Sequence, residues 1–407
     1  MSCLKLPQLQ QLSRPTAGAF ASQRTLLSRA VAGQRLYSSG GLSSKAELNL
    51  PFDYNHSSFL YKNSAAAQKA LSLPPSTKTS KLNLHNALNN ALAHLLETNP
   101  RSALFGEDVA FGGVFRVTSG LLDRFGPDRV FNTPLTEQGI IGFGVGLAAA
   151  GHLALPEIQF ADYMFPGYDQ LHSEASTWRF RSGGADWCNS GQLIVRMPCG
   201  AVGHGAMYHS QSPEGVFSNL QGVRTIMPRS PAQAKGLLLA AAECGDPVIF
   251  MEPKILYRAV LEEVPVEAYK IPIDKAEIVK EGKDITIVSY GAMMYTVEQA
   301  ALHAEEKLGV SVEIIDLRTL KPWDKETVTQ SVNKTGRLVV VHESGKTGGL
   351  GEGISAEITE RCFLRMESPV KRVTGWDTHM SLAFEKFTLP DVARVFHAIK
   401  SSIEYGA

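Results

Sequence analysis

This chain of 407 residues has few cysteines, no long apolar run and no excess of either charge. Its five cysteines are scattered and include no C-x-x-C pair, which favours reduced, mostly structural thiols in a non-secreted protein. No apolar stretch approaches the roughly 18 residues that cross a bilayer, so we expect no membrane span. What remains is an ordinary globular composition, 44% hydrophobic and 20% charged, on a length that suits two domains.

The sequence motifs of several enzyme classes are also missing. Residues 345–347 resemble the end of a P-loop, but Val340 stands where that motif requires a glycine. The glycines of residues 349–353 miss the spacing of the dinucleotide fingerprint, so a nicotinamide-dependent oxidoreductase is only a remote alternative. Neither H-E-x-x-H nor the nucleophile elbow G-x-S-x-G occurs, and no run has metal-ligand spacing.

The N-terminal segment differs in composition from the rest of the chain. Residues 1–46 are rich in Ser, Gln and Ala and contain six basic residues but no Asp or Glu. This composition is typical of a mitochondrial transit peptide, with cleavage expected near residues 35–39; an ordinary basic tail is the alternative. Without this segment the protein is mildly acidic, which argues against nucleic acid as its main partner.

Helix and strand patterns alternate along the remaining chain. Residues 47–80 are polar and punctuated by Pro and Ser, and we expect an extended arm there. Residues 256–274 are rich in Glu and Pro and predict a linker between domains at 81–255 and 275–407. Alternation of this kind predicts an α/β fold with mainly parallel sheets covered on both faces. The main strands are expected at 103–105, 155–160, 193–197, 224–227, 247–251, 285–289, 312–315 and 337–341.

Polar residues collect where three of the predicted strands end. Residues 106–108 follow one of them, residues 159–163 close another, and the glycine-rich segment 198–214, which carries His204 and His209, closes a third. Ligands of open parallel sheets bind outside the carboxyl ends of the strands, so we predict the functional site at this carboxyl-end rim. A histidine there is suited to proton transfer, although a lone loop histidine is more often structural.

One carboxyl group stands at the start of a helix of small residues. Beyond its first residues, the segment 136–151 has no charge and no side-chain amide, so we expect Glu137 to lie in or beside an apolar wall. A carboxyl group there is costly unless it has a partner or takes a proton, and such groups usually bind a ligand or take part in catalysis. The alternative is a helix N-terminal glutamate stabilised by the macrodipole.

From about residue 80 to the C-terminus, the sequence resembles the β subunits of the thiamine-diphosphate-dependent branched-chain 2-oxo acid dehydrogenases, the decarboxylating component of a mitochondrial multienzyme complex. The resemblance rests on Glu137 and on four segments, 160–163, 209–214, 252–258 and 316–324. The pyruvate dehydrogenase β subunits tend to differ at Phe-Ala-Asp-Tyr and Ser-Pro-Glu. A pyruvate dehydrogenase β subunit stays open as an alternative, as does a non-catalytic subunit that docks on the lipoyl acyltransferase core.

The resemblance implies a pyrimidine-binding domain followed by a transketolase C-terminal-like domain, located in the mitochondrial matrix. It implies oxidative decarboxylation of branched-chain 2-oxo acids, with transfer of the acyl group to lipoyl groups of the acyltransferase core. Glu137 would then hydrogen-bond the aminopyrimidine ring of the cofactor and favour its imino tautomer. Tyr163 would stack on the cofactor, Leu135 would contact it through its backbone, and His209 would handle the acyl intermediate or the lipoyl group.

The resemblance also implies two metal ions and a second type of chain. In this family the magnesium ion of the cofactor is held mainly through a Gly-Asp-Gly motif, which this sequence lacks. An α subunit would supply it, which predicts an α2β2 assembly. A structural potassium ion is implied, held mostly by backbone carbonyls; Ala241 and Cys244 depart from the family's usual side chains. Its positions are Gly191, Leu193, Ile194, Ala241, Cys244 and Asp246.

Overall fold

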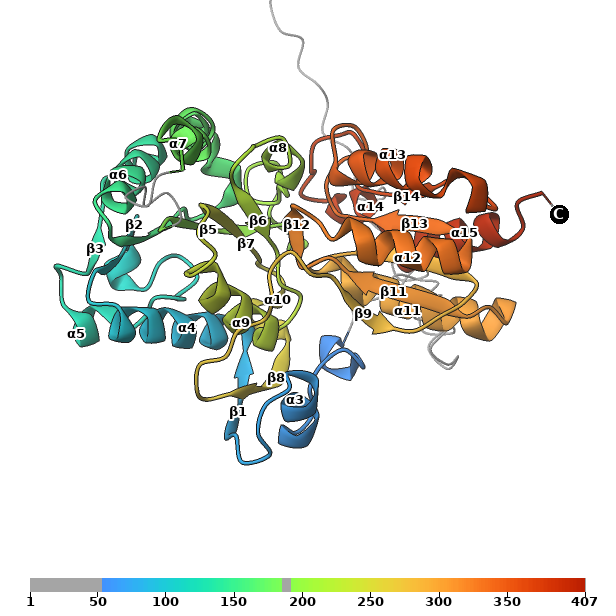
Figure 1. Cartoon of the computed structure of the whole chain (residues 1–407), viewed down its shortest axis with the longest axis horizontal. Helices are drawn as coiled ribbons and strands as arrows, with labels where there is room; N and C mark the ends of the chain where they lie inside the picture. The colour runs from blue at the N-terminus through green and yellow to red at the C-terminus, as the bar shows by residue number, and fades with distance from the viewer. Residues whose placement is uncertain (1–52, 185–191, 407) are drawn as a thin grey trace, which may run out of the picture. The chain divides into compact units, whose positions relative to one another are not determined.

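A computed structural model describes residues 53–184 and 192–406 (Figure 1). The predicted transit peptide, the start of the arm and Gly191 lie outside these residues. Within them, two largely parallel sheets are each covered by helices on both faces, so the predicted α/β architecture is confirmed. No helix in the described ranges is long and apolar enough to span a bilayer.

The first sheet, counted over the described residues, has seven strands in the order β12-β6-β7-β5-β4-β2-β3. All pairs are parallel except that of β12, which comes from the C-terminal half and pairs antiparallel with β6. The strands are β2 (Ser102–Gly106), β3 (Val130–Asn132), β4 (Leu153–Glu157), β5 (Ile194–Cys199), β6 (Arg224–Ile226), β7 (Val248–Pro253) and β12 (Thr319–Lys321).

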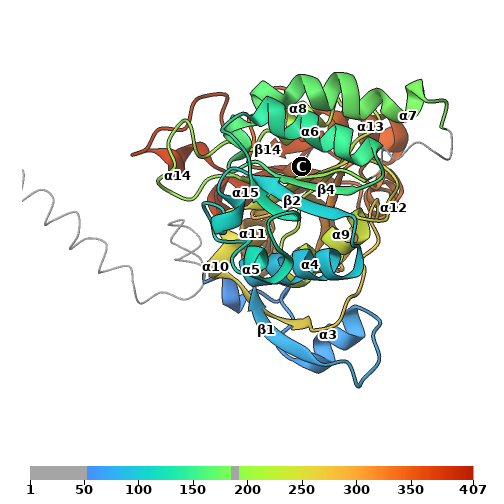
Figure 2. The ribbon, with the colours of Figure 1, turned by 90° about the vertical axis from the view of Figure 1, so that its left-hand side faces the viewer.

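Helices cover the first sheet on both faces, as Figures 1 and 2 show. One face carries α4 (Leu84–Thr98) and α9 (Pro231–Ala241), and the other carries α6 (Glu137–Ala149) and α7 (Ser176–Arg181). The side chain of Asn83 caps α4 by accepting a hydrogen bond from the backbone N–H of Asn86. The leucines of α4 recur at helical spacing and are buried, which fixes the face that packs on the sheet.

The second sheet, again within the described residues, has five strands in the order β14-β13-β10-β11-β9, and only β9 runs antiparallel. Its strands are β9 (Glu277–Lys280), β10 (Ile285–Ser289), β11 (Val312–Asp316), β13 (Leu338–Val341) and β14 (Lys371–Val373). The helices of this half are α11 (Met293–Leu308), α12 (Lys325–Thr335), α13 (Leu350–Cys362), α14 (Glu385–Thr388) and α15 (Val392–Ile403). One cluster of buried apolar residues draws on both sheets and includes Met197 of β5 and Val288 of β10.

The predicted arm and the predicted linker both contain regular structure. The arm holds α3 (Ser64–Ala70) and the start of β1 (Thr79–Asn83), and the expected linker holds α10 (Leu256–Ala259) and β8 (Leu261–Pro265). Strands β1 and β8 pair antiparallel, so each is stabilised by a partner far away in the sequence. The predicted arm therefore includes a helix and, like the predicted linker, a strand whose pairing with a distant segment gives no local signal.

Residues 165–181 contain a 3-10 turn (Phe165–Gly167), a π-helical segment (Gln170–Ala175) and α7. Gly167 lies against α6 so closely that an added Cβ atom would come within 2.9 Å of the Glu137 carbonyl oxygen and 2.5 Å of Ile141. This close approach holds the segment after β4 against the start of α6.

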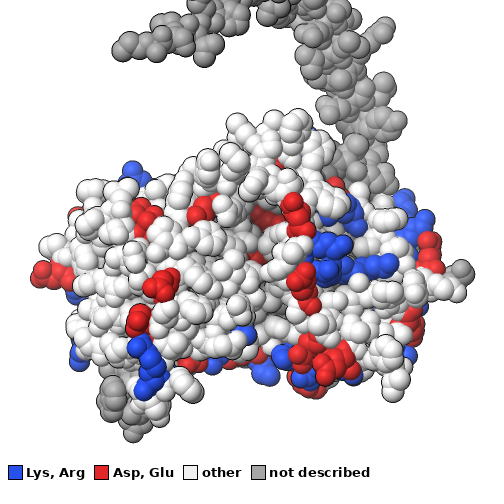
Figure 3. All heavy atoms as spheres, turned by 90° about the horizontal axis from the view of Figure 1, so that it is seen from above, with Lys and Arg blue, Asp and Glu red and all other residues white. Residues whose placement is uncertain are grey.

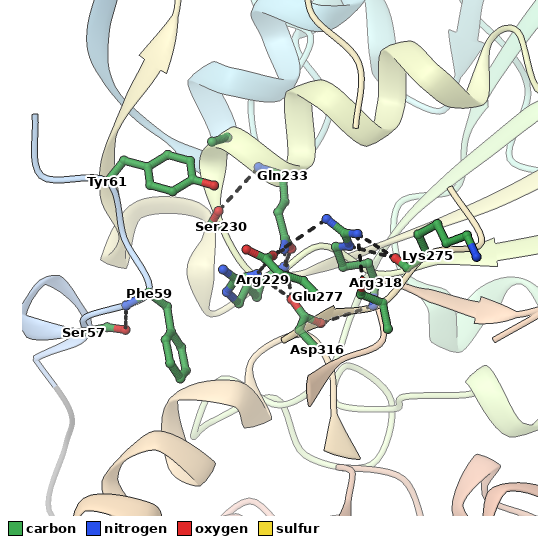
Figure 4. A network of polar contacts seen from close by, with 12 residues as sticks. Ser57, Phe59, Tyr61, Arg229, Ser230, Gln233, Lys275, Glu277, Asp316 and Arg318 are labelled. Carbon is green, nitrogen blue, oxygen red and sulfur yellow. Dashed lines mark hydrogen bonds and ion pairs between the residues drawn. The ribbon is translucent and has the colours of Figure 1, made fainter. Parts of the chain in front are cut away.

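A buried network of ion pairs joins the two halves of the described chain (Figure 4). Arg229, between β6 and α9, donates to Asp316 of β11 at 2.6 Å and to Glu277 of β9 at 2.9 Å. Gln233 donates to the same two carboxylates at 2.9 and 3.0 Å. Burial opposes ionisation of Glu277, but the Arg229 guanidinium outweighs it and holds the pKa of Glu277 below its ordinary value. The network therefore fixes the two sheets relative to each other.

Candidate active site

The sheet order brings together the strand ends that the sequence predicted to form the site. Strands β5, β4 and β2 are neighbours and parallel, so their carboxyl ends meet at one rim. Residues 106–108 follow β2, residues 159–163 follow β4 and the loop 200–211 follows β5, while α6 starts beside them after β3. The three segments predicted to form one rim therefore lie at the same edge of the sheet.

Tyr163 and His209 are in direct contact at this rim. The Tyr163 hydroxyl lies 3.1 Å from Nε2 of His209, and the imidazole packs edge-on against Phe160 with ring centroids 4.7 Å apart. Burial raises the pKa of Tyr163, and the carboxylates of Asp162 and Glu137 raise it further. The phenol therefore stays protonated at neutral pH. Because the Glu137 carboxylate acts on Tyr163, we place Glu137 in the same site as Tyr163 and His209.

Glu137, which we expected to lie in or beside an apolar wall, is only partly buried. Its side chain is partly exposed, and the neighbouring Leu135 is 86% exposed. The reason is local: α6 begins at Glu137, behind the Thr136 cap, so its first turn extends beyond the buried Ile140 and Ile141. In this chain by itself, the Glu137 side chain is only partly buried, so a ligand or another chain can reach it.

Glu107 is a member of the site that was not predicted as a site residue. Its Oε1 atom is buried and has no hydrogen-bond partner among the described residues. Burial raises the pKa of Glu107, with further contributions from Glu137 and Asp108. In the sequence, Glu107 is recognisable only as a polar residue that follows a strand. Its closeness to Glu137 depends on the pairing of β2 with β3.

These residues fit the pyrimidine half of a thiamine-diphosphate site. The buried, unpartnered carboxyl oxygen of Glu107 and the partly exposed carboxyl group of Glu137 can take hydrogen bonds from a nitrogen heterocycle. The exposed Tyr163 ring, 37% exposed, is available for stacking. The unpaired oxygen of Glu107 is the observation that favours a polar ligand over plain packing.

A buried ion triad supports the rim from below. Arg196 of β5 is completely buried and forms a bidentate pair with Glu252 of β7, with distances of 2.8 and 3.1 Å, and a bond of 2.6 Å to Glu157 of β4. Glu157 accepts from Gln159 at 3.0 Å, and Gln159 donates to the Glu107 carbonyl at 2.8 Å. The triad therefore connects three strands to the segment that carries Glu107.

The described positions implied for potassium come from two neighbouring segments. The Leu193 carbonyl, just before Ile194, accepts from the Val248 N–H at 2.9 Å, so the start of β5 lies beside the turn that follows Ala241. The Asp246 carboxylate is taken by two arginines, Arg179 at 2.6 Å and Arg224 at 3.0 Å, and Cys244 donates its thiol to the Asp246 carbonyl. These positions offer potassium backbone carbonyls but no free carboxylate. In the described ranges no cluster of His, Cys, Asp or Glu is arranged as a metal site.

Glu343 follows β13 and lines a cavity of about 320 Å³ beside the His209 loop, together with Met207 and Trp376. Burial raises its pKa to about 7, with Glu214 and Glu385 adding to the effect and the Ala201 N–H and Lys254 opposing it. The site therefore holds an acid that titrates near neutral pH.

This titration predicts a pH-dependent stability. Between about pH 4.5 and 7 the folded protein keeps a proton on Glu343 that the unfolded chain has lost, so stability falls as the pH rises through that window. In a Glu343→Gln variant this loss is absent, and its free energy of unfolding relative to wild type should rise by up to about 3 kcal/mol across the window. Denaturation measured from about pH 5 to about pH 8 tests this, and parallel curves for the two proteins would contradict it.

Two family models match the chain: the transketolase pyrimidine binding domain over residues 80–260 and the transketolase C-terminal domain over residues 274–395. A solved structure described as a split gene transketolase, an inactive beta4 tetramer, has the same fold, with a TM-score of 0.57 at 22% identity; it covers 79% of this chain and 98% of that chain. The fold and the rim thus define a chain of the transketolase-like class, whose pyrimidine-binding domain implies thiamine diphosphate as cofactor.

The mitochondrial 2-oxoisovalerate dehydrogenase subunit beta of Chaetomium thermophilum is 53% identical over 392 residues, covering 93% of this chain and 83% of that protein. The subunit of the same name from Dictyostelium discoideum is 55% identical over 325 residues, covering 80% and 87%. The pyruvate dehydrogenase E1 component subunit beta of Mycoplasma pneumoniae is more distant, at 41% over 330 residues, covering 81% and 100%. The chain belongs to the family of 2-oxoisovalerate dehydrogenase β subunits, which confirms the predicted resemblance.

Proposed function

We propose that this chain is the β subunit of a 3-methyl-2-oxobutanoate dehydrogenase (2-methylpropanoyl-transferring), which oxidatively decarboxylates branched-chain 2-oxo acids and passes the acyl group to a lipoyl group. The observation that carries the proposal is the meeting of Glu137, Tyr163 and His209 at one rim, in a chain 53–55% identical to 2-oxoisovalerate dehydrogenase β subunits. The site chemistry and the family therefore point to the same reaction.

Thiamine diphosphate, when bound, supplies an electron sink for cleavage of the bond between the carboxyl and carbonyl carbons of the substrate. In our proposal, Glu137 holds a hydrogen bond to the pyrimidine ring, the Tyr163 ring lies against that ring and the backbone of Leu135 contacts it. His209 holds or moves a proton at Nε2. The Tyr163 hydroxyl, 3.1 Å from this nitrogen, orients the imidazole ring.

The rest of the site is assigned to a second chain. Large apolar side chains are exposed around α6 and α7 among the described residues, with Leu135 at 86%, Phe143 at 49% and Phe180 at 90%. Figure 3 shows the molecule from above the view of Figure 1, and most side chains in its left half are uncharged. An apolar surface of this kind marks a protein contact. We assign it to an α subunit that also holds most of the Mg²⁺ ligands, because this sequence has no Gly-Asp-Gly.

The remaining parts of the proposal are an α2β2 assembly, docking on the lipoyl acyltransferase core and a location in the mitochondrial matrix. The two relatives from Chaetomium and Dictyostelium are named mitochondrial, and the name subunit beta implies an α partner for them. Potassium is proposed at Leu193, Ile194, Ala241, Cys244 and Asp246, together with Gly191, through backbone carbonyls. The closeness of the Leu193 and Val248 segments supports that proposal.

Reconstitution tests the proposed function. The chain is co-expressed with an α chain that carries a Gly-Asp-Gly motif, and thiamine-diphosphate-dependent decarboxylation is measured with the 2-oxo acids derived from valine, leucine and isoleucine and with pyruvate. We expect kcat/KM for the branched-chain acids to exceed that for pyruvate by at least about tenfold, the scale of one or two methylene contacts. Preference for pyruvate, or tight cofactor binding by the β chain without α, would contradict the proposal.

A further inference from the structure

The loop that carries His209 is anchored by an acid from the C-terminal half of the chain. The backbone N–H groups of Gly203 and Gly205 donate to the two carboxylate oxygens of Glu385, at 2.6 and 3.0 Å. The hydroxyl of Ser210, the residue after His209, donates to the same carboxylate at 3.2 Å. Glu385 opens α14 and is only 1% exposed, so its side chain is fully committed to this loop.

Two further acidic side chains complete the anchoring of the loop. Asp162 accepts from the backbone N–H groups of Ser210 and Gln211, at 3.1 and 3.0 Å, and Glu343 accepts from that of Ala201. The backbone is therefore held on both sides of His209. Hydrogen bonds from backbone N–H groups to carboxylates are charge-assisted and stronger than neutral ones, so they determine where the loop lies.

These outside anchors add to the loop's own closing hydrogen bond, in which the Gly200 N–H donates to the Gln211 carbonyl at 2.9 Å. Gly200 and Gly203 have positive φ values of 84° and 92°, and glycines at such positions lose much conformational freedom on ordering. The ammonium group of Lys254, 5% exposed and without a hydrogen-bond partner among the described residues, lies near the carboxylates. It supplies positive charge to Asp162, Glu343 and Glu385, which allows three acids to be grouped under one loop.

We propose that Glu385 is a positioning residue for His209: it binds the loop from the C-terminal domain and thereby sets the distance and orientation of the imidazole relative to the Tyr163 hydroxyl. The inference rests on the proposed function, since the role of His209 in the reaction belongs to that proposal. The inference adds one point to the proposed function. The site lies on the first sheet, but its geometry depends on a side chain of the second domain.

The test uses the assembled α and β complex with thiamine diphosphate. Glu385→Ala is expected to lower kcat about tenfold to a hundredfold, the scale that a displacement of a catalytic group by about 1 Å produces, with KM for the oxo acid nearly unchanged. Glu385→Gln keeps an acceptor oxygen and should recover part of that loss. In a His209→Ala background, Glu385→Ala should cause no further loss, because its effect passes through His209. Equal losses in both backgrounds would overturn the proposal.

A second readout does not depend on turnover. Hydrogen exchange of the backbone amides of residues 200–211 should speed up in Glu385→Ala and less in Glu385→Gln, while Glu360→Ala, an exposed acid on α13, leaves it unchanged. Unchanged exchange in both Glu385 variants would overturn the anchoring role even if the wild-type complex is fully active. A wild-type complex inactive on every branched-chain acid would instead refute the proposed function, and faster exchange would still support the anchoring.

Discussion

Replacing Glu137 by glutamine is expected to lower decarboxylation of branched-chain 2-oxo acids by the assembled dehydrogenase at least about a hundredfold, the scale of a lost acid–base group. Glutamine has nearly the same shape but cannot bind or release the proton that favours one tautomer of the pyrimidine ring. The Glu137 side chain makes no hydrogen bond within the described residues, so the substitution should leave the stability of the chain nearly unchanged. Steady-state rates and melting temperature of the reconstituted complex check both expectations.

The competing explanation of Glu137, a glutamate that only stabilises the first turn of α6, makes a different prediction. Asp123 lies in the first turn of α5 (Leu121–Phe125) and is exposed, so Asp123→Asn is a matched control for loss of a charge at a helix N-terminus. If both variants lose a little stability and neither loses activity, Glu137 is structural and the chain is a docking subunit without a catalytic role. If only Glu137→Gln loses activity while it still assembles with the α chain, the catalytic assignment stands.

The sequence was most informative where local patterns determine structure. Buried β-branched strands and helices at regular spacing identified the α/β fold, and the polar residues that follow the strands identified the rim. Side-chain exposure was predicted less well: the small residues of α6 suggested a buried Glu137, but its position in the first turn leaves it open. A run of small residues indicates that a helix packs closely against its neighbours. It does not indicate where the helix begins relative to the rim, and this start decides how exposed Glu137 is.

Contacts between distant segments were not predictable from local patterns. Glu385 and the glycines it binds are about 180 residues apart, and nothing in either segment indicates the other. The same holds for β1 and β8, and for Arg196, whose partners Glu157 and Glu252 become visible only once the order β7-β5-β4 is known. These contacts depend on the pairing of strands, which sets neighbours in space without regard to their distance in the sequence.

Arg196→Leu is expected to destabilise the protein by about 3–5 kcal/mol, the cost of removing one partner of a buried ion pair. The Arg196 side chain is 1% exposed, and its loss leaves the carboxylates of Glu157 and Glu252, 4% and 0% exposed, without a counter-charge. Burial already raises the pKa of Glu252 despite Arg196, so removal of the guanidinium raises it further. Chemical denaturation of the wild-type and variant proteins at neutral pH measures the difference.

The pH dependence separates this mechanism from a simple packing defect. In Arg196→Leu the buried acids take up protons on folding, so the folded form is favoured at low pH and loses stability as the pH rises above the ordinary carboxyl pKa. The deficit relative to wild type should therefore be smaller near about pH 5 than near about pH 8. Arg124→Leu is the matched control, because Arg124 pairs with Glu97 at 2.9 Å on the surface, with exposures of 50% and 61%, and should cost less than about 1 kcal/mol. A deficit that is the same at every pH would show that lost packing, and not the two unpaired acids, accounts for the effect.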